Sequence, residues 1–317
     1  MTELAFIHVA VGVIVNSSNE VLISLRPAQS HQGGLWEFPG GKLEAGEDAL
    51  CALRREFAEE LGIDVQNCFP LKKIKHHYAD KSVVLDVWQI TEYRGTPRGR
   101  EGQAIEWRAI QNLNEADFPA ANAGIIRTLN LPAEIAITPD VANFAELTQL
   151  IQRLLSQNLR IIQFRQKKLD GHTYLEWFEW AQAQCLLAGT KLMFNQDMAI
   201  SLQAKALDYH ASSQRLMSLK KRPIDQNLLF SASCHTLEEL KHAETLEADF
   251  VFLSPVADTK KYTRERILGW QAFRELANQA SVPVYALGGV SRNDLITARA
   301  HGGSGIAGIS TFAGTPL

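Results

Sequence analysis

The second part of the chain alternates short apolar segments with helical ones, and this alternation restricts the fold more than any other feature. After Pro132, eight apolar segments of strand length follow one another, mostly separated by stretches with helical periodicity. Strands that alternate with helices in this way pair in parallel, and eight such units close into a barrel. We therefore predict an α/β fold, a (β/α)8 TIM barrel, with an almost absent last helix. The eight segments are EIAITPDV, LRIIQFRQK, KLMFNQ, LDYHAS, LLFSASCH, DFVFLSPV, VPVYALGGV and GSGIAGIST.

The residues before Pro132 have a different rhythm. Residues 4–16 and 21–27 are apolar and β-branched around the turn NSSNE, which predicts a β-hairpin. A helix is expected over residues 47–61, ended by Gly62, and another over 121–130. Further strand patterns occupy 71–78, 82–92 and 104–109, so a mixed sheet with a few helices, an α+β fold, is expected. A chain of 317 residues favours two domains, which we place at 1–131 and 132–317.

Composition excludes several classes of function. The net charge of −3 does not favour direct nucleic-acid binding, whereas a nucleotide substrate remains compatible with it. No apolar stretch reaches the ~18 residues that a membrane span needs, and the N-terminus lacks the basic region of a signal peptide. The four cysteines form no C-x-x-C pair, which predicts buried, reduced thiols in a cytoplasmic protein. A homodimer is left open.

Three carboxylates are close together in the first helix. Glu56, Glu59 and Glu60 stand at positions i, i+3 and i+4, which places them on one face of an α-helix. Like charges at this spacing repel unless a cation lies among them, and Mg²⁺ or Mn²⁺ suits oxygen ligands. The alternative is a solvated acidic face. Gly40 and Gly41 allow tight turns before the helix, and Arg55 can pair with Glu47 to fix that loop.

The spacing around these carboxylates resembles the Nudix hydrolase family over residues 4–130. The match consists of Gly41, Glu47, Arg55-Glu56-Phe57, Glu59-Glu60 and Gly62-Ile63. Further segments are similar to MutT-type 8-oxo-dGTP pyrophosphohydrolases, namely LISLRPAQSHQGGLWEFPGGK, YADK, GREGQAIEW and FPAANAGII. The resemblance implies metal binding by Glu56, Glu59, Glu60 and Glu101. It implies nucleotide binding by Arg26, Phe38, Gly40, Gly41, Asp80 and Asn122, with Lys81 where an Arg is expected.

In this interpretation, water activated by the metal attacks the β-phosphorus of a nucleoside triphosphate and releases the monophosphate and pyrophosphate. One helix carboxylate acts as the base, and the sequence leaves open which one. Asn122 would offer an amide donor and acceptor to a purine edge, although a helix N-cap is an alternative role. Core packing is the alternative for Phe38. Two rival functions are a hydrolase of thiamine-pathway pyrophosphates and a non-enzymatic Nudix-fold binding module.

Polar residues follow the barrel strands at the end where such barrels carry their sites. Arg165 and Lys167 alternate along one strand, so both can face the same mouth. Gly288-Gly289 and the turn at Ser310 are typical of a phosphate-binding nest. His235 also ends a strand and could act as an acid or base near neutral pH, or be a helix-capping or buried histidine.

These strand ends resemble thiamine phosphate synthase and its thiazole-tautomerase relative TenI over residues 134–314. The matching stretches are IIQFRQK, SASCHTLEEL, ADFVFLSPVADTKK and VPVYALGGV. The resemblance implies a pyrophosphate held by Arg165, Lys167 and Lys260, Mg²⁺ on Asp197, and proton transfer by His235, with thiazole or thiamine phosphate as ligand. Residues 210–216 (HASSQRL) lack a second metal-binding Asp. We rank a synthase-like barrel of altered activity first, a tautomerase second and a working synthase third; a non-catalytic binding module is the alternative class.

Overall fold

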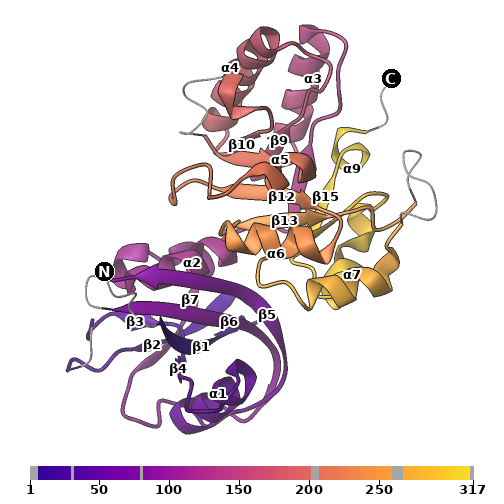
Figure 1. The fold of residues 1–317 in the computed structure, drawn as a ribbon. Helices are drawn as coiled ribbons and strands as arrows, with labels where there is room; N and C mark the ends of the chain where they lie inside the picture. The colour runs from indigo at the N-terminus through magenta and orange to yellow at the C-terminus, as the bar shows by residue number, and fades with distance from the viewer. Residues whose placement is uncertain (1–5, 30–31, 79–80, 201–206, 259–266, 315–317) are drawn as a thin grey trace. The chain divides into compact units, whose positions relative to one another are not determined.

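The computed structural model describes residues 6–29, 32–78, 81–200, 207–258 and 267–314. The chain divides into two compact units, Met1–Leu131 and Pro132–Leu317 (Figure 1). Each unit has buried hydrophobic clusters of its own. No helix in the described ranges is long and apolar enough to cross a membrane.

The first unit contains two small sheets, and the predicted α+β fold is confirmed. In the four-stranded sheet, of order β4-β1-β6-β5, β1 runs parallel to β6 and the other pairs are antiparallel. The three-stranded sheet, of order β3-β2-β7, is wholly antiparallel. The elements are β1 (Phe6–Ile14), β2 (Glu20–Leu25), β3 (Trp36–Glu37), β4 (Gly40–Lys42), α1 (Ala49–Glu56), β5 (Asp64–His77), β6 (Ser82–Arg94), β7 (Ile105–Ala109) and α2 (Ala123–Leu129).

The predicted hairpin between residues 4–16 and 21–27 is wrong. β1 and β2 belong to different sheets and are joined by one isolated antiparallel bridge, Val15 to Val21. Both edges of β1 are already taken by β4 and β6, while β2 pairs with β3 and β7. Alternation and a turn indicate where a strand reverses direction, but they do not say which neighbour it chooses.

The helix predicted over residues 47–61 consists of two parts. α1 begins after Asp48, whose side chain accepts a hydrogen bond from the Cys51 amide at 2.8 Å. After Glu56 the chain forms a π-helical turn, Phe57–Leu61, and Gly62 ends it as predicted with φ 68°. A π turn is wider than an α turn and changes the direction in which its side chains point.

The second unit is a closed barrel of eight parallel strands, β8 to β15, in which β15 returns to pair with β8. The eight apolar segments of the sequence are the eight strands, so the predicted TIM barrel is confirmed. The strands are β8 (Glu134–Ile137), β9 (Ile161–Phe164), β10 (Lys191–Phe194), β11 (Tyr209–Ala211), β12 (Phe230–Cys234), β13 (Phe250–Leu253), β14 (Val284–Leu287) and β15 (Gly305–Gly308). The helices are α3 (Phe144–Leu155), α4 (Gly171–Leu187), α5 (Ser213–Ser218), α6 (Leu237–Thr245), α7 (Gly269–Ala277), α8 (Leu295–Ala300) and α9 (Ser310–Ala313).

The four cysteines are unpaired thiols, as expected. Cys185 and Cys234 are buried, but Cys51 is exposed on α1, so the expectation of uniformly buried thiols is wrong there. Cys51 lies on the side of α1 away from the buried residues Ala52 and Leu53.

A glycine in β1 allows the π turn to pack closely against the sheet. A Cβ atom on Gly12 would lie 2.2 Å from Cζ of Phe57, which is fully buried. We expect Gly12→Ala to destabilise the first unit by about 1–3 kcal/mol through overpacking. Hydrogen-exchange mass spectrometry of β1 and α1 measures this effect. Gly171→Ala is the control, because its Cβ would have only ordinary contacts at 3.6 Å, and equal protection in the two variants would contradict the prediction.

Candidate functional site

The first unit has a cavity of about 280 Å³ between its sheet and the loops around α1. Apolar side chains of β1 and β6 line one part of it, and charged or polar side chains line another. The cavity can therefore accept a ligand that has both an apolar, planar portion and a charged one. The lining includes Val9, Val11, Arg26, Glu37, Phe38, Gly40, Gly41, Glu60, Lys81, Val83, Leu85 and Asn122.

Glu60, in the π turn, is the acidic centre of this cavity. Burial raises the pKa of the Glu60 carboxyl to about 8, and the charges of Glu56, Glu37 and Glu101 add to the effect. Four carboxyl groups thus influence one another electrostatically near the cavity. Repulsion among neighbouring carboxylates disfavours their ionised forms, and a bound cation would stabilise those forms.

Glu56 and Glu59 both contact Nη1 of Arg55, but Glu59 is the more exposed of the two. The Glu56 side chain is 15% exposed, whereas that of Glu59 is 57% exposed and contacts Arg55 at 3.2 Å. Glu59 is also not among the charges that raise the pKa of Glu60. The three carboxylates were expected on one face of a regular α-helix, and the π turn breaks that regularity after Glu56.

Arg55 connects the helix to the glycine loop. Its guanidinium donates to both carboxylate oxygens of Glu47, at 3.1 and 3.0 Å, and to the carbonyl of Lys42 at 3.1 Å. The pairing predicted between Arg55 and Glu47 is therefore present. A further bond to Glu56 Oε1, at 2.8 Å, holds that carboxylate beside the loop. These fixed donors lower the pKa of the Glu47 carboxyl.

Gly40 and Gly41 leave room for this arrangement. A Cβ on Gly41 would lie 2.0 Å from the Glu56 carboxylate, and one on Gly40 would lie 2.1 Å from the Ala10 carbonyl. Gly40 also has φ 147°, which other residues rarely adopt. Gly40 and Gly41 were predicted to bind the nucleotide. In the structure, a side chain at Gly41 would clash with Glu56, and one at Gly40 would clash with the backbone of β1.

The carboxylates fit a divalent cation by their chemistry. No three His, Cys, Asp or Glu side chains in the described ranges are already arranged around a single point, because Arg55 engages Glu56 and Glu59. Oxygen donors of high negative charge density are nevertheless the ligands that hard divalent cations prefer. The absence of a side chain at Gly41 leaves room for the Glu56 carboxylate, whose atoms are the three nearest to this position. Glu56, Glu60 and Glu101 are the residues that could hold the ion.

Glu37 was missed in the sequence. It lines the cavity, and Arg26 donates a hydrogen bond to its carboxylate. Burial raises the pKa of Glu37, and Arg26 only partly offsets this effect. The signal available in the sequence was its position directly before Phe38-Pro39-Gly40. Arg26, which is predicted to bind the nucleotide, lines the same cavity and contacts Glu37.

Asn122 and Phe38 form the other side of the cavity. The Asn122 side chain caps no helix, so the capping alternative is wrong, and Oδ1 instead faces the Phe38 amide at 3.4 Å. Phe38 is 2% exposed and stacks on Phe118 with ring centroids 5.5 Å apart, so it is a core residue that also lines the cavity. Asp80 lies outside the described residues, and Lys81 lines the cavity.

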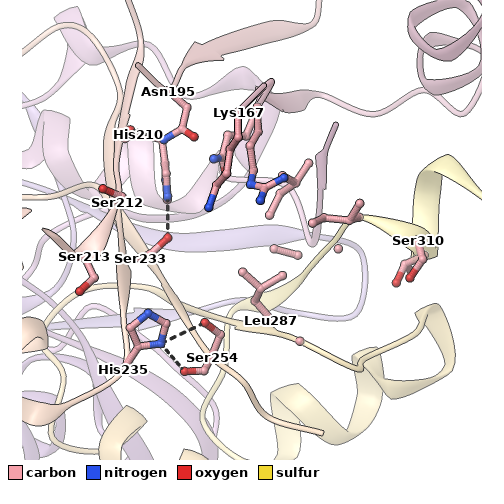
Figure 2. Close-up of a pocket in the computed structure, with 18 of the residues that line it drawn as sticks. Lys167, Asn195, His210, Ser212, Ser213, Ser233, His235, Ser254, Leu287 and Ser310 are labelled. Atoms are coloured by element: carbon pink, nitrogen blue, oxygen red, sulfur yellow. Dashed lines mark hydrogen bonds between the residues drawn. The ribbon is translucent and has the colours of Figure 1, made fainter. Parts of the chain in front are cut away.

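The second unit has a larger cavity, of about 650 Å³, at the carboxyl ends of its strands (Figure 2). Most residues predicted for this site line it, but Asp197 does not. Asp197 is exposed, and its carboxylate accepts a hydrogen bond from the Ala199 amide at 2.9 Å. Lys260 lies outside the described residues. The predicted residues that line the cavity are Arg165, Lys167, His235, Gly288, Gly289 and Ser310.

The two glycines after β14 pass close to the loop that follows β13. Gly288 and Gly289 have φ 92° and 69°, and a Cβ on Gly289 would lie 2.4 Å from the Asp258 carbonyl. Successive residues with this backbone conformation can turn amide groups toward an anion. Positions 288 and 289 therefore need glycine because of their positive φ and their close approach to the loop after β13. The same backbone conformation is compatible with a phosphate-binding nest.

His235 presents one ring nitrogen to the cavity. Its Nδ1 lies 2.6 Å from the carbonyl oxygen of Ser254, and Figure 2 shows the ring turned toward Ser254. Because a carbonyl only accepts, Nδ1 carries a proton, and Nε2 in the neutral ring has a free lone pair. The N-cap of α6 is Thr236, so the helix-capping alternative for the His235 side chain is wrong.

His210 is buried between two serines at the wall of this cavity. Nδ1 lies 2.7 Å from Ser231 Oγ and Nε2 lies 2.8 Å from Ser233 Oγ. Burial, and secondly the charge of Arg215, lowers the pKa of His210 to about 3. The ring is therefore neutral at physiological pH and connects the two hydroxyl groups.

Comparisons with known proteins agree with both halves. A family model described as "Thiamine monophosphate synthase" matches residues 134–312, more than half of the chain, and one described as "NUDIX domain" matches residues 10–128. The 8-oxo-dGTP diphosphatase of Escherichia coli (strain K12) is 40% identical over 123 residues, which cover 39% of this chain and 95% of the relative. The CTP pyrophosphohydrolase of the same organism is 35% identical over 129 residues, 39% of this chain and 96% of the relative.

For the barrel, a relative named "Putative thiamine-phosphate synthase 2" from Aquifex aeolicus (strain VF5) is 28% identical over 184 residues, covering 58% of this chain and 99% of the relative. The chain thus belongs to the Nudix family through its first unit and to the thiamine monophosphate synthase family through its second. The predicted combination of a MutT-like diphosphate hydrolase with a thiamine phosphate synthase-like barrel is confirmed. Members of the Nudix family generally use a divalent metal ion.

The buried neutral His210 makes the barrel sensitive to acid. Its pKa is about 3 in the folded chain but about 6.5 when unfolded, so the unfolded state binds the extra proton first. The free energy of unfolding contributed by His210 is complete above pH 6.5 and falls as the pH drops below it, by up to about 1.4 kcal/mol per pH unit. Denaturant unfolding between pH 7 and 4.5 should show a shallower loss for His210→Gln than for wild type. The exposed His172→Gln variant is the control and should follow wild type; identical slopes for all three proteins would refute the assignment.

Proposed function

We propose that the first unit is a Mg²⁺-dependent nucleoside triphosphate pyrophosphohydrolase whose preferred substrate is 8-oxo-dGTP. Mn²⁺ could replace Mg²⁺. The observation that carries the proposal is one cavity bounded by Asn122 and Phe38 on one side and by Glu60 and its neighbouring carboxylates on the other. The reaction would remove oxidised purine nucleotides from the pool used for DNA replication, which is a DNA-repair function.

The acidic side would hold the metal ion and the triphosphate. When bound, the divalent cation neutralises charge on phosphate oxygens and makes water easier to deprotonate. Glu56, Glu60 and Glu101 would hold it, with Glu59 as a further predicted ligand. Arg55 keeps Glu56 in place through its bonds to Glu47 and the Lys42 carbonyl.

The structure favours Glu60 among the helix carboxylates as the base that takes the proton from the attacking water. Glu60 lines the cavity, while Glu59 is mostly exposed and Glu56 is bonded to Arg55. Attack at the β-phosphorus would yield the nucleoside monophosphate and pyrophosphate. The spacing of Glu56, Glu59 and Glu60 alone does not distinguish which of them is the base, and the contacts above favour Glu60.

The opposite side would recognise the base. Asn122 Oδ1 has a lone pair beyond its long contact with the Phe38 amide, and Nδ2 has two hydrogens. An 8-oxo-purine presents a carbonyl acceptor and, at N7, an N–H donor, so both atoms of the amide can pair with it. Guanine has an acceptor at N7, which would face Oδ1 without a hydrogen. Val9, Val11, Val83 and Leu85 supply an apolar surface for the ring.

Two rival substrates follow from the comparisons and from the fusion itself: CTP, which the name of one relative suggests, and pyrophosphates of thiamine-type compounds. A screen of pyrophosphate release with Mg²⁺ over 8-oxo-dGTP, dGTP, CTP and thiamine pyrophosphate separates these alternatives. If 8-oxo-dGTP were no better a substrate than dGTP, the proposed preference would be wrong. A homodimer and a cytoplasmic location stay predictions.

The carboxylate assignment is tested by Glu56→Gln. The amide keeps the shape of the side chain and removes its charge, so we expect an intact fold and a loss of about 10²-fold or more in kcat. Steady-state kinetics with 8-oxo-dGTP and circular dichroism measure the two effects. Glu92→Gln, at an exposed position of β6, is the matched control; near wild-type turnover of Glu56→Gln would overturn the assignment.

The base-recognition assignment is tested by Asn122→Ala. Removing the amide should lower kcat/KM for 8-oxo-dGTP by about 10–10³-fold and lower that for dGTP much less, because only the oxidised base uses both amide atoms. The ratio of the two kcat/KM values is the measurement. Asn67→Ala, at an exposed position on β5, should leave the ratio unchanged. An equal fall for both substrates would show that Asn122 only supports the fold of the cavity.

A further inference from the structure

The barrel cavity is lined by cations and by no carboxylate. Among the described residues that line it, Arg165, Lys167 and Arg215 carry positive charge and none is Asp or Glu. The nearest balancing charge shown for Arg165 is Asp140, whose carboxylate lies 3.6 Å from the guanidinium and outside the lining. The cavity is therefore suited to an anion and unsuited to a free cation.

The residues present do not fit the divalent metal ion that the resemblance to thiamine phosphate synthases implies. Asp197, the expected ligand, is exposed, stands outside the lining and accepts the Ala199 amide within the turn that follows β10. The loop after β11 and the first residues of α5 contribute Ser212, Ser213 and Gln214 to the cavity, and all three are neutral. Hard divalent cations need several anionic or carbonyl oxygens, and this loop supplies no carboxylate to the lining.

Arg215, in the first turn of α5, lines the cavity and is held by neutral partners. Its Nη2 donates to Gln196 Oε1 at 2.7 Å and its Nη1 to the Asn195 carbonyl at 3.3 Å. Within the described ranges no carboxylate lies at ion-pair distance from it. The two neutral oxygens thus orient the Arg215 guanidinium but do not compensate its positive charge. Its charge also contributes to the lowered pKa of His210 at the wall of the cavity.

We propose that this cavity binds a phosphate or diphosphate group directly through Arg215, together with Arg165 and Lys167, and without a divalent metal ion. A guanidinium presents a planar pair of N–H donors that matches two phosphate oxygens, so it can take the place of a bridging cation. The ligand class is a small phosphorylated molecule. This inference is independent of the hydrolase function proposed for the first unit.

Isothermal titration calorimetry of the full chain with inorganic phosphate and inorganic pyrophosphate tests the inference. With EDTA present, which removes metal from both units, we expect one of the two anions to bind. Adding excess Mg²⁺ should not be required for this binding and should weaken that of pyrophosphate by complexing it. Binding that appears only with Mg²⁺, or no binding of either anion in EDTA, would overturn the proposal.

Two variants assign the binding to Arg215. Arg215→Gln should lower the affinity in EDTA by about 10-fold or more, the usual range for loss of a charge-assisted hydrogen bond. Lys220→Gln removes one positive charge from an exposed position of the same segment and is the matched control. An effect of Arg215→Gln no larger than that of Lys220→Gln would contradict the assignment.

Gln196→Glu keeps Arg215 in the chain and gives it a carboxylate partner of nearly the same shape. We expect this variant to remain folded, as judged by its thermal unfolding temperature, and to lose affinity about as much as Arg215→Gln. Because the partner atom of Arg215 stays an oxygen, loss of binding here would reflect neutralised charge and not a collapsed loop. Unchanged affinity in a folded Gln196→Glu protein would refute the role of the Arg215 charge.

Discussion

The Arg55 guanidinium is the contact on which the first site depends. It joins Glu47 and the Lys42 carbonyl in the glycine loop to Glu56 on the helix. Without this cation, the carboxylates of Glu47 and Glu56 would repel each other. Glycine at position 41 leaves space for Glu56 in this contact. The Arg55 guanidinium thereby offsets part of the repulsion among the carboxylates, and a bound divalent ion would offset the rest.

Much of this site could be predicted because many of its contacts join residues that are close together in the sequence. The Arg55–Glu47 pair and the glycine approach follow from spacing along a short segment. The π turn could not be predicted from spacing, which assumes a regular α-helix; the turn contains Glu59 and Glu60, and its residues Phe57 and Leu61 are fully buried. Glu37 was missed for a related reason: its burial beside Arg26 depends on the pairing of β2 with β3.

The same division holds for the folds. Eight repeats of one local pattern define the barrel, because parallel strands joined by helices have few ways to close. In the first unit, one sheet mixes parallel and antiparallel neighbours, and β1 pairs with β6, whose residues stand 76 positions later in the chain. The hairpin interpretation failed at that point. Local pattern identifies a strand, and competition among distant edges decides its neighbours.

The barrel shows a property that no single segment of the sequence displays. Arg165 and Lys167 follow β9, whereas Arg215 lies in α5, after β11. Only the assembled mouth reveals that no described lining residue is acidic. The two sites that we propose for phosphate-bearing ligands therefore have opposite electrostatics. A carboxylate site depends on a cation that solution must supply, so chelation disables it; a guanidinium site carries its cation covalently and keeps its affinity when free metal is scarce.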